Sequence, residues 1–344
     1  MKNNLEIIDP LSTPKWDDLV LSGTQYCFFH SSAWARVLHE TYGFKPIYYI
    51  IKNQDGLDFL LPVMETSGLA AKKRGVSLPF SDYCRPIIDD NIDINSVMRL
   101  VYHNMKENRW VYLETRDAEA IYRDNHYSCY YTHTLDLFRD QSEIKKNIST
   151  SVKRNIKKAI SSGITAESYT DYKALEAFFK LHCLTRKRLG VPIQPFRFFN
   201  NIYKYIIQQN LGLIILARWE DKFISGAVYF HYGKQALYKF GASNMKYQHL
   251  RGNDLVMMNA IEHYMNNDYH TFSFGRTAVG NEGLRRFKNK WGVQENIIRY
   301  YRYNLIKNNY KKHSGHNEMI FRFTKYLPVP VLRLIGNGLY KYMA

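Results

Sequence analysis

The amino-acid sequence predicts a mixed α/β protein made of two related halves. A helical segment, a strand, a polar turn and a returning strand follow one another over residues 31–63, and the same succession recurs over 198–229. The turn residues Asp55 and Asp221 set the two copies 166 residues apart, since 221 − 55 = 166. Identity between the copies is negligible, so the repeat is one of architecture.

Composition and charge narrow the class of protein. The 344 residues are 45% hydrophobic and 23% charged, which is typical of globular chains and excludes a disordered or collagen-like one. This length allows about two domains. No run approaches 18 apolar residues and no signal peptide is visible, so we expect a cytoplasmic protein without a membrane-spanning helix. The net charge of +17 (48 Lys+Arg against 31 Asp+Glu) favours phosphate-bearing partners.

Helix and strand signals in both halves support this prediction. Ser31 is a good N-cap, and the apolar residues over 34–38 share one face of a helix that closes at Gly43. The other elements expected in the first half are strands over 47–51 and 57–63 and a loop over 66–75. Those expected in the second half are a helix over 198–209 and strands over 213–217 and 223–229.

A basic segment over 143–163 joins the halves. Its apolar residues recur every fourth position and predict one stripe on one helix: Ile144, Ile148, Val152, Ile156 and Ile160. The remaining surface is basic: Lys145, Lys146, Lys153, Arg154, Lys157 and Lys158. The basic surface of this helix has three interpretations: it is solvated, it binds a polyanion, or it contacts a membrane surface.

The chain ends in an apolar segment with basic neighbours. Residues 321–340 contain Pro328 and Pro330, followed by an apolar run in which Arg333 is embedded. We expect a helix that packs back on the body, with an interfacial membrane anchor as the alternative.

The four cysteines give no metal or disulfide signature. Cys27, Cys84, Cys129 and Cys183 lie tens of residues apart and form no CxxC pair, so the sequence predicts no metal site. We expect buried thiols, while a Cys/His pair that meets only in space stays open.

Chemistry-bearing residues are densest over 269–292. A strand pattern over 269–274 leads into Gly275-Arg276-Thr277, and a turn-rich stretch then precedes residues 285–292. Four cations lie within that last stretch: Arg285, Arg286, Lys288 and Lys290. Such a set suits a phosphate clamp, because Arg binds phosphate oxygens in a fork and Lys acts as a point charge.

Several motifs, taken in order, resemble one known family. They are Leu78-Pro79-Phe80-Ser81-Asp82-Tyr83, the helix over 178–190, Gly241-Ala242-Ser243, Phe272-Ser273-Phe274-Gly275-Arg276-Thr277, Asn281-Glu282-Gly283-Leu284 and Phe287-Lys288-Asn289-Lys290-Trp291-Gly292. Together they resemble the Fem-like branch of the GNAT acyltransferase superfamily. That branch includes the Fem peptidoglycan aminoacyltransferases and GNAT-domain proteins associated with exopolysaccharide export. The resemblance covers most of the chain.

The resemblance implies two tandem GNAT-like domains, each a mixed, mostly antiparallel sheet flanked by helices. We expect these domains over 1–140 and 141–305, and a basic, apolar helical tail over 306–344. The implied activity is transfer of an acyl or aminoacyl group to an amine or hydroxyl of a peptidoglycan or exopolysaccharide precursor. Acyl-CoA or aminoacyl-tRNA would be the co-substrate, with no permanently bound cofactor. The implied partners are a phosphate-bearing envelope precursor, charged tRNA and an anionic membrane surface, but not DNA.

The resemblance also assigns residues by position. Lys288 would be catalytic, contacting the acceptor phosphate or stabilising charge on the reacting carbonyl oxygen. The residues implied for substrate binding are Arg188, Arg276, Trp291, Asp82 and Tyr83. Those implied for binding the co-substrate's pyrophosphate, ahead of a helix N-terminus, are Gln248, Arg251 and Gly252.

Two positions depart from the family pattern. Ser273 stands where the family often has Asp, which leaves Asp82 and Glu114 as candidate carboxylates. Asn253-Asp254 replaces the second small residue of the pyrophosphate loop, and Asp254 would compete for the positive end of the helix. Ser273 and the basic, apolar tail leave a non-catalytic scaffold of polysaccharide assembly as one alternative. The basic helix over 143–163 and the many tyrosines leave an RNA-binding protein as another.

Overall fold

A computed structural model describes residues 4–54, 56–68, 72–122, 125–138, 140–311 and 326–343. The chain divides into two compact units. The first comprises residues 1–130, 297–314 and 341–344, and the second comprises 131–296 and 315–340. The chain therefore enters the second unit within strand β7 (Ser128–Asp136) and leaves it within β13 (Gln294–Asn304). These bounds differ from the sequence-based ones, because residues 297–305 lie in the first unit.

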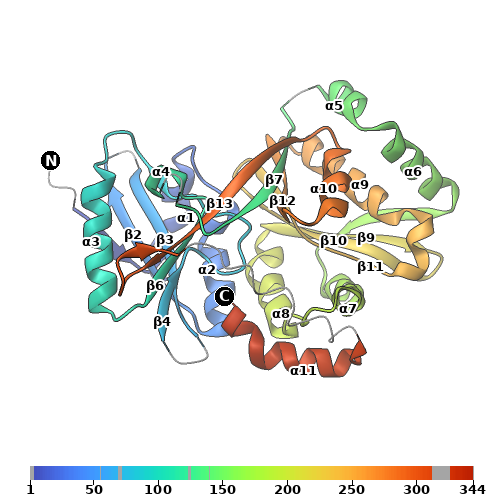
Figure 1. Ribbon diagram of the computed structural model, residues 1–344. Coiled ribbons are helices and arrows are strands. Elements are labelled where there is room, and N and C mark those ends of the chain that lie inside the picture. Colours follow the sequence, from blue (N-terminus) through green and yellow to red (C-terminus); the bar gives the residue numbers. More distant parts are fainter. Residues whose placement is uncertain are drawn as a thin grey trace. The chain divides into compact units, whose positions relative to one another are not determined.

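The first unit contains one mixed sheet (Figure 1). Its strands are β1 (Glu6–Ile8), β2 (Lys45–Lys52), β3 (Leu57–Ser67), β4 (Lys73–Val76), β5 (Ile87–Ile88), β6 (Tyr112–Arg116), the part of β13 from Ile297, and β14 (Asn309–Tyr310). The spatial order is β1-β2-β3-β4-β6-β13, with β5 beside β3 and β14 beside β13. Among these pairs only β4 and β6 run parallel. The loop predicted over 66–75 is shorter than expected, because residues 73–75 pair with β3.

Helices cover both faces of this sheet. They are α1 (Trp16–Leu21), the 3₁₀ turn η1 (Phe28–His30), α2 (Ser32–Tyr42), α3 (Ile94–Glu107) and α4 (Glu119–Tyr122). Six consecutive residues of β2 are buried, as expected for a strand with both faces covered. Its alternate residues from Ile47 to Ile51 pack with the apolar face of α3. Ser31 caps α2 by accepting from the Trp34 amide, and Gly43 ends it at φ +71°, as predicted.

The strands of the second unit lie side by side in the order β7-β12-β11-β10-β9-β8. The strands are β7 from Tyr131, β12 (Thr271–Ala278), β11 (Gln235–Ser243), β10 (Lys222–Tyr232), β9 (Gly212–Trp219) and β8 (Ile164–Tyr169). Strands β8 to β11 are antiparallel, whereas β11 and β12 are parallel. Both units thus confirm the predicted mixed, mostly antiparallel sheets, and each contains a helix followed by a hairpin, α2–β2–β3 and α8–β9–β10.

Helices form a layer on each side of the second sheet (Figure 1). They are α5 (Gln141–Asn147), α6 (Thr150–Ser161), α7 (Tyr172–Leu189), α8 (Phe196–Tyr205), η2 (Ile207–Gln209), η3 (Met245–Leu250), α9 (Gly252–Asn266), α10 (Glu282–Asn289) and α11 (Val329–Leu339). The short turn η5 (Tyr340–Met343) follows α11, and its residues from Lys341 belong to the first unit. Helices α6 and α9 pack together on one face, and α7 and α8 pack on the other. Within the described residues, no helix is both long and apolar enough to span a bilayer.

The basic segment forms two helices, not the single one that its period predicts. Ile148 is extended, with ψ 131°, and the Ser149 side chain caps α6 by accepting from the Val152 amide. Ser149 is thus a helix start within an otherwise continuous apolar pattern. The stripe is buried at Ile144 and Val152 but 60% exposed at Ile160.

The C-terminal helix α11 packs on α7. Leu332 is fully buried, and the Arg333 guanidinium lies 5.6 Å from the centre of the Phe179 ring. Gly336 lies against the segment between α7 and α8, and a Cβ on this residue would overlap the carbonyl oxygen of Ile193. Residues 312–325 of the predicted tail lie outside the described residues.

Candidate active site

A pocket opens in the second unit at the start of α9, and the strand that precedes this helix pairs only briefly with its parallel neighbour. β11 and β12 pair only over Gln235–Leu237 and Thr271–Ser273, although both strands continue. The pocket has a volume of about 380 Å³. Its lining comes from α6 (Asn155), β10 (Ile224, Ser225), the end of β11 and η3 (Ser243, Asn244, Tyr247, Gln248), the start of α9 (Arg251–Asp254) and α10 with the residue after it (Gly283, Arg286, Phe287, Lys290).

The N-terminus of α9 faces this pocket without a side-chain cap. Arg251 occupies the N-cap position at φ +63°, and its side chain accepts no hydrogen bond from the helix. The amides of a first helical turn have no partners within the helix, and they carry the positive end of the helix dipole. These groups can therefore hold an anion such as a phosphate.

A small residue lets α9 approach strand β10. A Cβ on Gly252 would lie 2.6 Å from Ser225 Oγ and 3.3 Å from Ile224 Cδ1. Ser225 is 3% exposed, and its Oγ has no hydrogen-bond partner among the described groups. A buried hydroxyl with no partner is costly. Because this one lines the pocket, a ligand there can satisfy it.

Charges of both signs surround the pocket. Arg251, Arg286 and Lys290 line it, together with the buried carboxyl of Asp254. Burial raises the pKa of Asp254, although a 3.3 Å hydrogen bond from Asn155 and the nearby cations oppose this shift. The structure thus brings Gln248, Arg251 and Gly252 to one pocket, and their role in binding a donor stays a prediction.

The predicted catalytic lysine is buried beneath a bend of β12. Lys288 is 2% exposed, and its Nζ donates to the carbonyl oxygens of Gly275, at 2.9 Å, and Arg276, at 3.1 Å. Gly275 has φ +68°, and its amide donates to Ser273 Oγ at 3.2 Å. In this structure the ammonium therefore supports the strand from which the Arg276 side chain projects.

Trp291 lies in the hydrophobic core of the second unit. It is fully buried, and its ring packs beside Phe274 and Phe287. The indole has no exposed face, so this geometry gives no support to its predicted place in an acceptor-lining surface. Its Nε1 has no hydrogen-bond partner among the described groups.

The other predicted substrate residues are spread over both units. Arg188 is exposed at the C-terminal end of α7, and Arg276 is half-buried on β12; neither lines the pocket. Asp82 and Tyr83 belong to the first unit. The carbonyl oxygen of Asp82 accepts from the Tyr300 hydroxyl at 2.7 Å, and the Tyr83 ring meets Phe29 edge-on.

The candidate carboxylate Glu114 serves an ion-pair network of the first unit. Its two oxygens face Arg116, at 3.4 Å, and Arg302, at 2.5 Å. Burial alone would raise the pKa of Glu114, but the two guanidinium groups hold it below its ordinary value. A carboxylate paired in this way is a poor general base.

A histidine that the sequence did not single out lies near Lys288. His133 on β7 is fully buried, and its Nε2 contacts Glu295 Oε2 at 2.9 Å. Burial lowers the pKa of His133, and Lys288 lowers it further. Two hydrogen bonds from the Arg285 guanidinium to the Glu295 carboxylate lower the pKa of Glu295 to about 2, which keeps this carboxylate ionised. His133 and Glu295 are 162 positions apart, so no local pattern could have paired them.

Comparison with known proteins identifies a domain in the second half of the chain. Residues 146–289 match the sequence profile of the acetyltransferase (GNAT) domain. No curated protein matches the sequence.

Three solved structures share the fold. FemX is 12% identical and superposes with a TM-score of 0.68 over 86% of this chain and 96% of its own. L-PGS from Bacillus licheniformis is 12% identical, with a TM-score of 0.54 over 96% and 97% of the two chains. A tandem GNAT protein from the clavulanic acid biosynthesis pathway is 10% identical, with a TM-score of 0.53 over 88% and 99%. The profile match indicates a GNAT-type domain over residues 146–289, and the three structures show that the fold of the chain is shared with FemX and with a tandem GNAT protein.

Proposed function

We propose that this protein transfers an acyl group from acyl-CoA to an amine or hydroxyl of a phosphate-bearing envelope precursor. The observation that carries the proposal is the uncapped N-terminus of α9, opening into a pocket with the unpartnered Ser225 hydroxyl. The pyrophosphate of the donor would accept from the first-turn amides, from Ser225 and from Arg251. Arg286 and Lys290 add positive charge along the wall.

The divergence of β11 and β12 supports a place for the amide-bearing chain of the acyl-CoA donor. Beyond Leu237 and Ser273 the parallel pair ends, so backbone groups of β11 and β12 are released from mutual pairing. Such groups can hydrogen-bond an amide-bearing chain laid between the strands. In the reaction the acceptor's nitrogen or oxygen bonds to the acyl carbon, the thioester C–S bond breaks, and the acceptor's proton leaves while CoA departs as the thiol.

The acceptor side rests on cations already predicted from the family resemblance. We place the acceptor phosphate against Arg276, whose own carbonyl is held by Lys288, with Arg188 as a second cation. Lys288 then acts as a positioning residue, because its ammonium is engaged by two backbone oxygens. A Lys288→Ala variant that transfers as fast as wild type would remove it from the mechanism.

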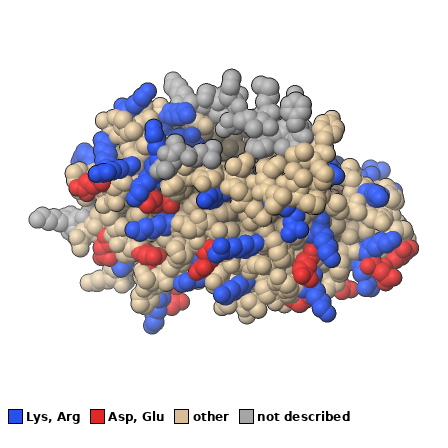
Figure 2. Space-filling view, turned by 90° about the horizontal axis from the view of Figure 1, so that it is seen from below, with Lys and Arg blue, Asp and Glu red and all other residues tan. Residues whose placement is uncertain are grey.

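Charged tRNA is the competing donor. The basic segment of α5 and α6 favours it, since Lys153, Arg154, Lys157 and Lys158 follow one another without an intervening acid. Over the face seen in Figure 2, however, basic side chains are spread widely with acidic ones among them, and they form no single patch there. Peripheral contact with an anionic membrane is part of the same proposal and would place the enzyme beside its acceptor.

A calorimetric titration with acetyl-CoA tests the donor. Wild type should bind saturably, and Arg251→Ala should lower the affinity roughly 10–100-fold, because a charge-assisted hydrogen bond contributes about 1.5–3 kcal/mol. Arg197→Ala is the matched control, since Arg197 is exposed on α8 and does not line the pocket. Absence of heat from wild type at millimolar acetyl-CoA would refute the acyl-CoA donor and make charged tRNA the next ligand to titrate.

The alternative classes give different results. An RNA-binding protein would bind uncharged RNA with an affinity that falls steeply with salt concentration. A non-catalytic scaffold would bind anionic vesicles and show no turnover with either donor.

A further inference from the structure

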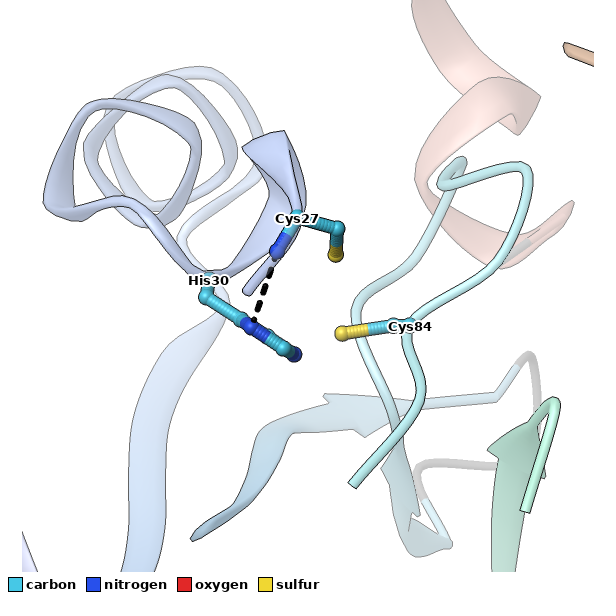
Figure 3. Close-up of side chains that lie close together, drawn as sticks. All are labelled: Cys27, His30 and Cys84. Atoms are coloured by element: carbon cyan, nitrogen blue, oxygen red, sulfur yellow. Dashed lines mark hydrogen bonds between the residues drawn. The ribbon is translucent and has the colours of Figure 1, made fainter. Parts of the chain in front are cut away.

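The first unit contains a buried cluster of three side chains that can each bind a metal ion, and none of them lines the pocket just described. Cys27 lies at the N-cap of η1, His30 ends that turn, and Cys84 comes from the loop between β4 and β5. The three are 4%, 0% and 0% exposed. One ligand atom from each lies within 4.8 Å of the others, and both thiols and the imidazole turn toward one another (Figure 3).

The imidazole is already oriented as in many metal sites. His30 Nε2 donates to the carbonyl oxygen of Arg85 at 2.9 Å, which leaves the lone pair on Nδ1. That atom accepts from the Cys27 amide over a long 3.3 Å contact. A metal-bound histidine usually donates its second N–H to a carbonyl or carboxylate, so the contact with Arg85 is the expected outer bond.

The charges of the three ligands suit a divalent cation. Two thiolates would balance the charge of a divalent cation, so the loaded site would bury no net charge. The combination of two soft sulfur ligands with one imidazole favours zinc over magnesium or calcium.

A second observation beside the cluster also points to a missing ligand. The Tyr48 hydroxyl is fully buried near both thiols, and it has no hydrogen-bond partner among the described groups. The loop that supplies Cys84 is strained as well, because the non-glycine residues Leu78 and Phe80 adopt φ +43° and +60°. A cross-link at Cys84 would help to hold that conformation.

We propose that Cys27, His30 and Cys84 bind a zinc ion through two thiolates and one imidazole nitrogen. The ion would tie the η1 turn to the loop that carries Asp82 and Tyr83, the residues expected to meet substrate. This site is independent of the proposed transferase activity, since it shares no residue with the pocket of the second unit. The same two thiols could alternatively form a disulfide, and the experiment below separates the outcomes.

The test starts from the intact chain, purified without metal-affinity chromatography. Its zinc content should be close to one ion per chain. Replacement by Co²⁺ should give a near-ultraviolet thiolate-to-cobalt charge-transfer band. Wild type with no bound zinc and no charge-transfer band after incubation with the metal would overturn the proposal, as would a Cys27–Cys84 disulfide found by mass spectrometry in the freshly isolated protein.

Variants locate the site. Cys27→Ser and Cys84→Ser should each lose the charge-transfer band, whereas Cys183→Ser, which removes a buried cysteine of the second unit, should retain it. A band that survives in Cys27→Ser and Cys84→Ser would place the metal elsewhere and refute the assignment. If those variants do not fold, the wild-type zinc content and cobalt spectrum still decide. Acetyl-CoA titration runs in parallel and should give the same affinity with and without zinc.

Discussion

Gly252→Ala tests how closely α9 must approach strand β10. The added methyl would lie 2.6 Å from Ser225 Oγ, 3.3 Å from Ile224 Cδ1 and 3.4 Å from Ala217 Cβ. The first distance requires a shift of the helix start or of the serine. Overpacking of this kind costs about 1–3 kcal/mol, while the reduced backbone freedom of alanine offsets about 0.4–1 kcal/mol. We therefore expect a net destabilisation of about 0.5–2 kcal/mol.

Urea unfolding measures the stability change, and calorimetry measures acetyl-CoA affinity on the same samples. Because the helix start carries the anion-binding amides, both quantities should fall together. Gly280→Ala is the matched control, since a Cβ there meets nothing within 4 Å. Adding Ser225→Ala to Gly252→Ala removes the 2.6 Å contact and should restore part of the stability. Equal stability and affinity for Gly252→Ala and Gly280→Ala would refute the close approach as the reason for this glycine.

Further predictions concern three buried ionisable groups. Lys288→Met keeps the volume but removes two charge-assisted bonds to the carbonyls of Gly275 and Arg276, so unfolding free energy should drop by about 3 kcal/mol or more, measured in urea. Asp254→Asn should tighten acetyl-CoA binding about 2–5-fold at neutral pH, because a carboxylate near a helix N-terminus competes with the anion; unchanged affinity would argue against binding there. Because the pKa of Asp254 is raised, the native state keeps its proton to a higher pH than the unfolded state does. The free energy of unfolding should therefore fall as the pH rises above about 4 and through the native pKa, and Asp254→Asn should lack this dependence of stability on pH. Burial lowers the pKa of His182 to about 3, so the unfolded chain binds a proton before the native state does as the pH drops below about 6.5. The free energy of unfolding should therefore fall below pH 6.5 by up to about 1.4 kcal/mol per pH unit. In His182→Leu this dependence of stability on pH should be weaker.

Local signals predicted most of the fold. Ser31 and Gly43 bound α2 as expected, because caps act through neighbouring backbone groups. The hairpins of both halves also appear where alternating apolar residues flank a polar turn. The basic segment was predicted less well, because a period of apolar residues does not reveal that a serine inside it will cap a new helix.

The candidate site was predicted in part. Gln248, Arg251 and Gly252 meet in one pocket because they are close in sequence and precede a helix. The burial of Lys288 and Trp291 could not be predicted from their motif, which looks polar and exposed until β12 bends over it. The pairing of Cys27 with Cys84 was missed for a similar reason, since 57 residues separate them (84 − 27 = 57) and only the fold closes the gap.

Strand β13 delays completion of the first unit during synthesis. Tyr300 of β13 pairs with Arg116 of β6, and residues 131–296 of the second unit lie between them in the sequence. At about 5–20 residues per second, a ribosome needs roughly 10–40 s to cover these 184 positions (300 − 116 = 184). During that time one edge of β6 has no partner, and an unpaired edge can join a strand of another chain. The nascent chain therefore carries this open edge until β13 is made, after residues 131–296 of the second unit.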